Sequence, residues 1–207
     1  GEQGAQHSQS LHAWLAHVPG LRVVMPYSVE DARDMLIASV LCPDPVIYID
    51  DRWLYEKEEK LSPIEEKKIN NFPPKKIKSG NDLTIVGSSF STQLALDAAR
   101  ELEDINISAE VIDIRTLNPF KADNINNSVS KTGKLIVVDG GTKHAGFAAE
   151  VIATVVENFE PNELTAMPIR VTLPDAPAPT SRKLEKIYYP TIGQIIENAK
   201  GLCSKDR

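Results

Sequence analysis

From residue 81 to the C-terminus, short apolar runs alternate with segments of helical periodicity, and this alternation constrains the fold more than any other feature. The runs rich in apolar and β-branched residues predict strands over residues 83–86, 109–114, 135–138 and 169–172. Amphipathic patterns predict helices over residues 91–102, 122–130, 147–159, 182–188 and 191–200. Alternation of this kind implies right-handed crossovers, so we expect a mostly parallel sheet with helices on both faces.

The first fifty residues carry a shorter version of the same pattern. The predicted order is helix, strand, helix, strand, over residues 11–18, 21–25, 28–42 and 46–49. Ser28 and Asp31 are spaced as in a capping box at the start of the second helix. Two strands and two helices are too few for an independent core. We therefore expect this piece to be the end of a larger domain, with Gly1 at a boundary rather than at a natural start.

Residues 51–80 are rich in lysine, glutamate and proline and show little periodic hydrophobicity. We expect a surface linker here, with one helical turn and one short strand. The predicted organisation is thus an α/β piece over residues 1–50, the linker over 51–80, and a second α/β unit over 81–207.

Charge and composition exclude several classes of function. The chain has 29 acidic and 23 basic residues, a net charge of −6, and no basic patch, so a nucleic-acid partner is not expected. No apolar run approaches the roughly 18 residues that a membrane helix needs, and the N-terminus has no secretory signal. The two cysteines, Cys42 and Cys203, offer neither a disulfide framework nor metal-ligand spacing. These features favour a reducing compartment such as the cytoplasm.

His7 is the residue that best suits chemistry. It lies in a polar stretch before the first predicted helix, and imidazole titrates near neutral pH, which suits proton transfer or anion recognition. The alternative is a merely polar flank in which Ser8 or Ser10 caps the helix. His12 and His17 are five residues apart and do not share a helix face, so a zinc site is not expected.

Two further segments have alternative interpretations. The stretch from Asp139 to Gly146 follows a strand and precedes a helix, where ligands of open α/β sheets bind. Lys143 and His144 are candidate anion contacts, or the stretch is a tight turn in which Gly146 lets the helix pack closely. Asp175-Ala176-Pro177-Ala178-Pro179 predicts a rigid exposed segment, either a subunit contact or a plain loop.

Several stretches, in the same order along nearly the whole chain, resemble the β subunit of the E1 component of 2-oxoacid dehydrogenases. They include Gly4-Ala5-Gln6-His7-Ser8-Gln9-Ser10 and the segment 175–179. The others are residues 13–14, 17–26, 31–33, 44–47, 54–55, 110–119, 128–133, 146–150 and 170–172. No single motif is decisive, but their collinear order is specific.

The resemblance implies a fold and an activity. The fold would be α/β: a partial pyrimidine-binding domain followed by a complete transketolase C-terminal-type three-layer α/β/α domain with a mostly parallel sheet. The activity would be thiamine diphosphate-dependent oxidative decarboxylation of a 2-oxoacid, followed by acyl transfer to the lipoyl group of an E2 partner. Pyruvate is the default substrate, and branched-chain 2-oxoacids stay open. His7 matches the family's active-site histidine, which would contact the substrate carboxylate or assist protonation.

The same resemblance implies partners. An E1 α subunit would hold the diphosphate and Mg²⁺ through a Gly-Asp-Gly motif that this sequence lacks, and a second β subunit would complete the assembly. The glutamate that activates the cofactor would lie before Gly1, so these 207 residues alone are expected to be inactive. Some relatives bind K⁺ through carbonyls that would lie around Ser39 to Asp44, but Cys42 stands where an acidic residue is frequent.

Two alternatives stay open. One is a fragment of a transketolase-like enzyme or of a deoxyxylulose-phosphate synthase relative. The other is a non-catalytic assembly module that forms a dimer through its packed faces. The expected compartment of the protein is the cytoplasm, or the mitochondrial matrix if the source is eukaryotic.

Overall fold

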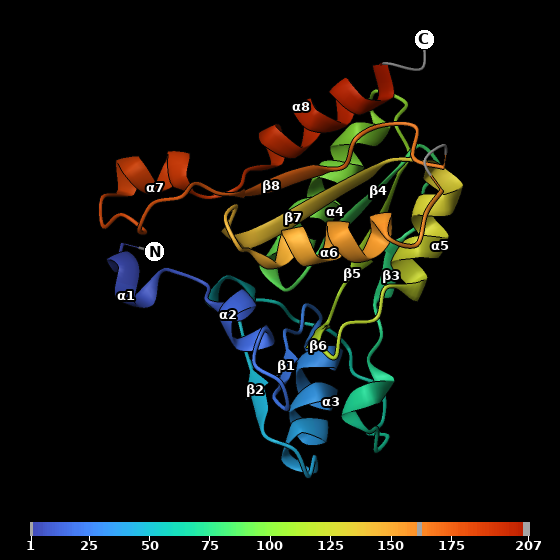
Figure 1. Cartoon of the computed structure of the whole chain (residues 1–207). Coiled ribbons are helices and arrows are strands. Elements are labelled where there is room, and N and C mark those ends of the chain that lie inside the picture. The colour runs from blue at the N-terminus through green and yellow to red at the C-terminus, as the bar shows by residue number, and fades with distance from the viewer. Residues whose placement is uncertain (1, 161–162, 205–207) are drawn as a thin grey trace.

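A five-stranded sheet organises the C-terminal part of the computed structural model, which describes residues 2–160 and 163–204 (Figure 1). The strand order is β3-β5-β4-β7-β8. These strands span Lys75–Lys78 (β3), Leu83–Gly87 (β4), Ala109–Asp113 (β5), Leu135–Thr142 (β7) and Ile169–Leu173 (β8). The pairs β4–β5, β4–β7 and β7–β8 are parallel, and the edge strand β3 is antiparallel to β5. The predicted mostly parallel sheet is confirmed.

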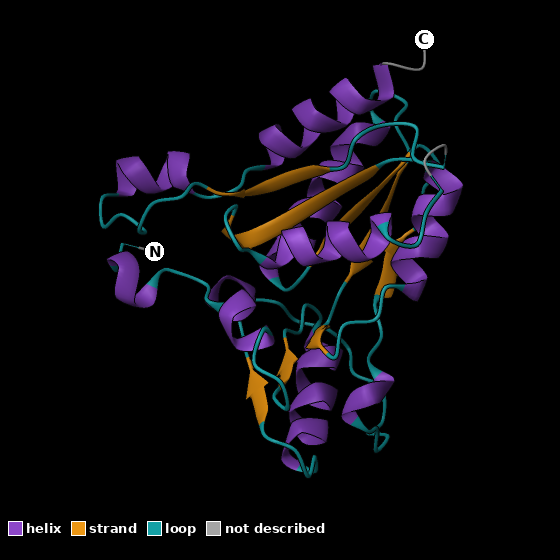
Figure 2. Cartoon of the chain, viewed as in Figure 1, coloured by secondary structure: helices purple, strands orange, loops and turns teal. Residues whose placement is uncertain are grey.

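Helices cover both faces of this sheet, which gives the predicted three layers (Figure 2). The helices of the C-terminal part are Phe90–Glu103 (α4), Asp123–Thr132 (α5), Phe147–Val156 (α6), Arg182–Tyr188 (α7) and Ile192–Cys203 (α8). Alternate residues of β7 face opposite sides. Ile136 and Val138 pack with α4 and α8, whereas Leu135 and Val137 pack with α5 and α6. Burial on both faces explains why these strands read as continuous apolar runs.

The N-terminal part holds a smaller sheet with the order β2-β1-β6. Its elements are Gly4–His7 (α1), His12–Ala16 (α2), Arg22–Val24 (β1), Val29–Val40 (α3) and Val46–Tyr48 (β2). The third strand, Thr116–Asn118 (β6), comes from later in the chain and pairs antiparallel with β1. The sequence analysis missed β6. A three-residue strand has no periodicity of its own, and its partner lies far away in the sequence.

The stretch predicted as a linker contains two helical turns, Arg52–Leu54 (η1) and Ile69–Asn71 (η2), followed by β3. This is one turn more than expected. The predicted end of β7 at residue 138 was wrong, because Asp139 and Thr142 still pair with β8 across a bulge. The turn into α6 is therefore shorter than predicted. The close packing predicted at Gly146 is confirmed, since a Cβ there would lie 2.0 Å from the Thr142 carbonyl oxygen.

Candidate functional site

His7 is the last residue of the single-turn helix α1, and its side chain is exposed. In the described part of the chain, no hydrogen bond or ion pair engages its ring. An exposed imidazole without a fixed partner is free to meet a ligand or another subunit. It can both donate and accept a hydrogen bond near neutral pH.

The residues around His7, in contrast, are anchored to the C-terminal part. The Ser8 carbonyl accepts a hydrogen bond from the Tyr189 hydroxyl (2.8 Å), and Gln9 Oε1 accepts one from the Ala178 backbone N–H (2.8 Å). Gly4 has a φ of +64°, and a Cβ there would lie 2.8 Å from Thr180 Cγ2, so only glycine is accommodated without strain. The backbone that carries His7 is thus held against residues 176–189.

The proline-containing segment is one side of this contact. Residues 174–177 are exposed as predicted, but Ala178 is buried beneath the N-terminal segment. The proline-containing segment therefore binds the His7 stretch of the same chain. It is more than a plain exposed loop.

Neither serine near His7 caps the start of α2, so that alternative was wrong; Ser8 is instead the C-cap of α1. The N-cap of α2 is Leu11, without a side-chain hydrogen bond. Ser10 Oγ instead lies 2.6 Å from His12 Nδ1. The hydroxyl is thus bound to an imidazole that points into the protein.

His12 is buried against Asp139, at 2% and 3% exposure. Its Nε2 lies 2.9 Å from Asp139 Oδ1. The two groups are in contact, but their orientation is not that of a hydrogen bond. A carboxylate at this distance favours the tautomer protonated at Nε2. Nδ1 is then an acceptor, and the Ser10 hydroxyl donates to it.

Asp139 is held by backbone groups at the carboxyl end of β7. Its Oδ1 accepts from the Gly141 N–H (2.8 Å) and its Oδ2 from the Ala148 N–H (2.9 Å). Burial works to raise the pKa of Asp139, but His12 and these two N–H groups outweigh it and hold the pKa below its usual value. The three linked side chains of Ser10, His12 and Asp139 therefore end on an ionised carboxylate. They join the two parts of the molecule.

The pairing of His12 with Asp139 was not predicted from the sequence, because the two residues come from different halves of the chain. No local spacing connects a histidine near the N-terminus with an aspartate at the end of β7. In the folded chain Gly141 leaves room for the imidazole, since a Cβ there would lie 3.1 Å from His12 Cε1. His17 does not contact Ser10, His12 or Asp139, and its side chain is exposed.

An aromatic cluster borders the anchored segment. Trp53 packs edge-to-face on Phe90 (4.6 Å between ring centroids) and on Tyr189 (5.1 Å), and it is 46% exposed. Tyr189 is the residue whose hydroxyl holds the Ser8 carbonyl. The turn η1 therefore packs against residues 176–189, which hold the His7 stretch.

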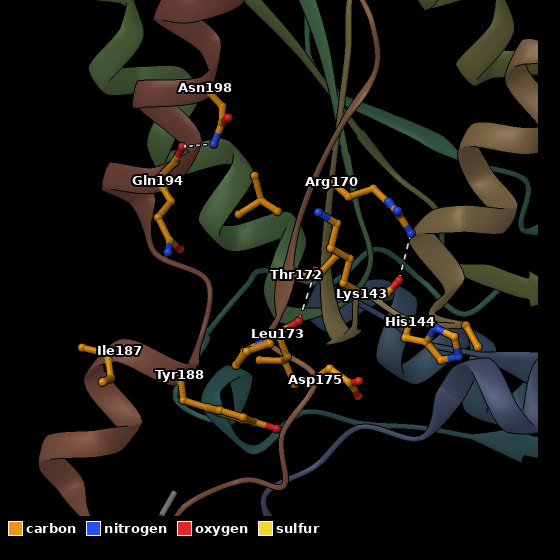
Figure 3. Close-up of a pocket in the computed structure, with 13 residues that line it drawn as sticks. Lys143, His144, Arg170, Thr172, Leu173, Asp175, Ile187, Tyr188, Gln194 and Asn198 are labelled. Carbon is orange, nitrogen blue, oxygen red and sulfur yellow. Dashed lines mark hydrogen bonds between the residues drawn. The ribbon is translucent and has the colours of Figure 1, made fainter.

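A separate hollow of about 680 Å³ is lined by residues of β8, α7, α8 and the turn after β7 (Figure 3). Lys143 and His144, the predicted anion contacts, are in its wall together with Arg170 of β8. Arg170 Nη1 donates to the Lys143 carbonyl (2.8 Å). The structure thus brings the two candidate residues to a cavity, but this cavity is not the place where His7 lies.

Among the described residues, no three His, Cys, Asp or Glu side chains gather in a way that could hold a metal ion. Of the described helices, none has the length and apolarity needed to cross a membrane.

Comparison with known proteins points to one family. Residues 75–195 match the family model described as the transketolase C-terminal domain, and residues 1–57 match the transketolase pyrimidine-binding domain. A solved structure titled "Split gene transketolase, inactive beta4 tetramer" covers 95% of this chain and 61% of its own. Its TM-score is 0.75 at 22% identity, which supports the fold alone.

Curated relatives are pyruvate dehydrogenase E1 component β subunits. The mitochondrial protein of Caenorhabditis elegans is 39% identical over 206 residues, which cover 95% of this chain and 56% of the relative. The mitochondrial β-1 protein of Arabidopsis thaliana is 40% identical, with 99% and 57% covered. The protein of Rhizobium meliloti is 34% identical, with 97% and 44% covered.

This chain thus spans about half the length of the curated relatives that it matches. The likeness nevertheless extends over both parts of the fold, and the predicted resemblance to E1 β subunits is confirmed. The chain belongs to the transketolase family, with residues 1–57 matching its pyrimidine-binding domain and residues 75–195 its C-terminal domain.

Proposed function

We propose that this chain is the β-subunit portion of a thiamine diphosphate-dependent 2-oxoacid dehydrogenase E1 with pyruvate as its substrate. The assembly would decarboxylate pyruvate oxidatively and transfer the acyl group to the lipoyl group of an E2 partner. The observation that carries the proposal is the exposed ring of His7 between neighbours that the C-terminal part anchors. Similarity to pyruvate dehydrogenase E1 β subunits along the chain supports it.

His7 would bind the substrate carboxylate or assist protonation during acyl transfer. Both roles need an imidazole on a fixed backbone, because a misplaced acid or base loses most of its effect. The hydrogen bonds of Ser8 and Gln9 with residues 176–189 hold the backbone at His7 in place.

Thiamine diphosphate would supply the carbon–carbon bond chemistry when bound. Because this sequence lacks the Gly-Asp-Gly motif that the resemblance implies for the diphosphate and Mg²⁺, we assign both to an E1 α subunit. The activating glutamate would also lie outside residues 1–207. The Ser39 carbonyl, in the stretch where some relatives bind K⁺, already accepts the Leu41 and Cys42 N–H groups, so K⁺ is not part of the proposal.

The partners would be the α subunit, a second β subunit and a lipoyl-bearing E2. Exposed apolar side chains support burial in an assembly, since large apolar patches usually mark interaction sites. Trp14 is 70% exposed, Val40 78% and Leu41 58%. The compartment would be the cytoplasm, or the mitochondrial matrix as in the names of the eukaryotic relatives.

The test is turnover of the native assembly that contains this chain, measured with pyruvate, thiamine diphosphate, Mg²⁺ and an artificial electron acceptor. Removal of a positioned acid–base group typically lowers the rate by 10²–10⁴. We therefore expect His7→Ala to lower kcat by about 10² or more without changing the unfolding midpoint. His17→Ala, at another exposed histidine, is the matched control and should leave kcat unchanged.

Unchanged turnover in His7→Ala would remove this residue from the mechanism. Comparison of pyruvate with a branched-chain 2-oxoacid and a ketose phosphate separates the proposal from its enzymatic alternatives. Absence of turnover with all three substrates would favour the non-catalytic assembly module.

A further inference from the structure

The hollow of about 680 Å³ is bounded by the end of β8, the turn between β7 and α6, and the helices α7 and α8 (Figure 3). Its volume lies in the range of metabolite-binding pockets. It does not include His7, Ser10 or His12. An inference about this cavity is therefore independent of the function proposed above.

Two cations in the wall lack a counter-ion. Among the described residues, neither Lys143 nor Arg170 forms an ion pair, and Asp175 is the single acidic residue of the lining. The guanidinium of Arg170 is held by its bond to the Lys143 carbonyl, which uses one of its five N–H donors. This cavity is thus cationic in a chain with a net charge of −6.

The opposite wall offers polar groups for the body of a ligand. Gln194 Oε1 accepts from the Thr191 N–H (3.0 Å), so its amide N–H groups are left to donate. Asn198 Nδ2 donates to the Gln194 carbonyl (2.8 Å), so its Oδ1 is left to accept. Figure 3 shows Gln194 and Asn198 on one side of the cavity and Lys143 and Arg170 on the other.

Apolar atoms complete the lining. The Tyr188 hydroxyl donates to the Ala176 carbonyl (2.9 Å), which fixes the ring at the edge of the cavity. Ile187 on the same helix is 77% exposed. The cavity therefore offers donors on one side, acceptors and donors on the other, and an apolar margin.

We propose that this cavity binds a small phosphate ester, with the phosphate group between Lys143 and Arg170. A phosphate dianion matches two cations, and the planar guanidinium and the point-like ammonium are complementary ways to bind its oxygens. Asp175, Gln194 and Asn198 would then bind hydroxyl groups on the organic part of the ester.

The experiment is titration of the chain with glycerol 3-phosphate, followed by ³¹P NMR and calorimetry, with inorganic phosphate and glycerol as comparison probes. We expect saturable binding of the ester, weaker binding of inorganic phosphate and none of glycerol. Lys143→Met should weaken ester binding about 10-fold. Its control, Lys183→Met, removes an exposed lysine of α7 outside the cavity and should leave binding unchanged.

A second variant separates the organic part from the phosphate. Asn198→Leu should weaken binding of the ester while leaving inorganic phosphate unaffected. Equal affinity of Lys143→Met and the unsubstituted chain would overturn the site. Equal affinity for ester and inorganic phosphate would overturn the assignment of the organic part. Since the Lys143 side chain makes no described hydrogen bond, its removal should not perturb folding, and circular dichroism checks this.

Discussion

His7 and His12 are five residues apart and have opposite environments. His7 is exposed and without a described partner, whereas His12 is buried between Ser10 and Asp139. The difference follows from what each side chain meets in the other part of the molecule. An exposed imidazole can serve chemistry, and a buried one bound to a carboxylate mainly holds the structure together.

The buried pair makes His12→Ala a test of stability. The substitution leaves the ionised Asp139 carboxylate buried with only its two backbone donors, and a buried charged group that loses a partner carries a desolvation penalty. We expect a loss of about 2–3 kcal/mol in the free energy of unfolding, measured by urea denaturation. His17→Ala, at an exposed site, should change it by less than about 0.5 kcal/mol. A similarly small effect of His12→Ala would show that the pair contributes little.

Asp113 at the end of β5 predicts a pH dependence. Burial is the main cause that raises the pKa of Asp113 to about 7. The Thr92 hydroxyl, which donates to Oδ1 (2.8 Å), opposes the shift, and the nearby Asp31 carboxylate adds to it. The native state thus binds a proton that the unfolded chain has lost between the usual pKa of 3.8 and about 7. Stability contributed by this group is present at low pH and is lost as pH rises through that window.

The slope for one such group is on the order of 1 kcal/mol per pH unit. We expect Asp113→Asn to flatten the fall in unfolding free energy between pH 5 and 7, because the amide cannot ionise and its oxygen still accepts from Thr92. Asp104→Asn, at an exposed carboxylate, should keep the slope of the unsubstituted chain. Identical slopes for Asp113→Asn and the unsubstituted chain would contradict the raised pKa.

Among the elements, α3 shows how far a local signal reaches. The predicted cap at Ser28 is confirmed, since its Oγ accepts from the Asp31 N–H (3.0 Å). The other half of the predicted capping box is wrong. The Asp31 carboxylate does not return to the helix start but binds Arg115 Nη1 (3.0 Å), which follows β5. Asp31, the predicted second residue of the capping box, thus binds Arg115, which is distant in the sequence.

Ser28→Ala should therefore destabilise the chain through the helix start alone. Loss of a serine cap typically costs about 1 kcal/mol. We expect that loss in urea denaturation, with the slope of unfolding free energy against urea unchanged. Ser79→Ala, at an exposed serine outside any helix, is the matched control and should be neutral. If both variants are equally stable, the cap does not contribute.

The large elements were predictable from the sequence, and among the small ones α1 and β6 were not. The predicted bounds of β4, β5, β8, α4 and α8 lie within a few residues of the observed ones. Burial on both faces or along a continuous stripe gives each of them a strong pattern. The elements α1 and β6 were missed because each is at most one turn or three residues long and depends on distant contacts.

At the scale of the whole molecule, the two parts interlock. The strand β6 leaves the larger part to complete the small sheet, and the N-terminal segment packs against residues 176–189. Exposed apolar residues on the small part, such as Val40 and Leu41, are left for further contacts. The single chain thus has the features of one component of an assembly.

This predicts the state of the protein in its source cells. If the proposed function is correct, the activating glutamate and the α subunit must be present in the active species. Native mass measured after capture of this chain should then be well above 22.8 kDa, and should include an E1 α-type polypeptide. The isolated chain should form a dimer by light scattering. A native species of 22.8 kDa without partners would contradict the E1 proposal and favour a binding module.

What the sequence by itself determined is the α/β class, the mostly parallel sheet of the C-terminal part and the family to which the chain belongs. These depend on local periodicity and on the collinear order of motifs. Only the tertiary structure decided that Asp139 meets His12, that residues 176–189 anchor the His7 stretch, and that Lys143 and Arg170 share a cavity. Such pairings join residues far apart in the chain, and the packing of complete elements brings them together without leaving a pattern in the local sequence.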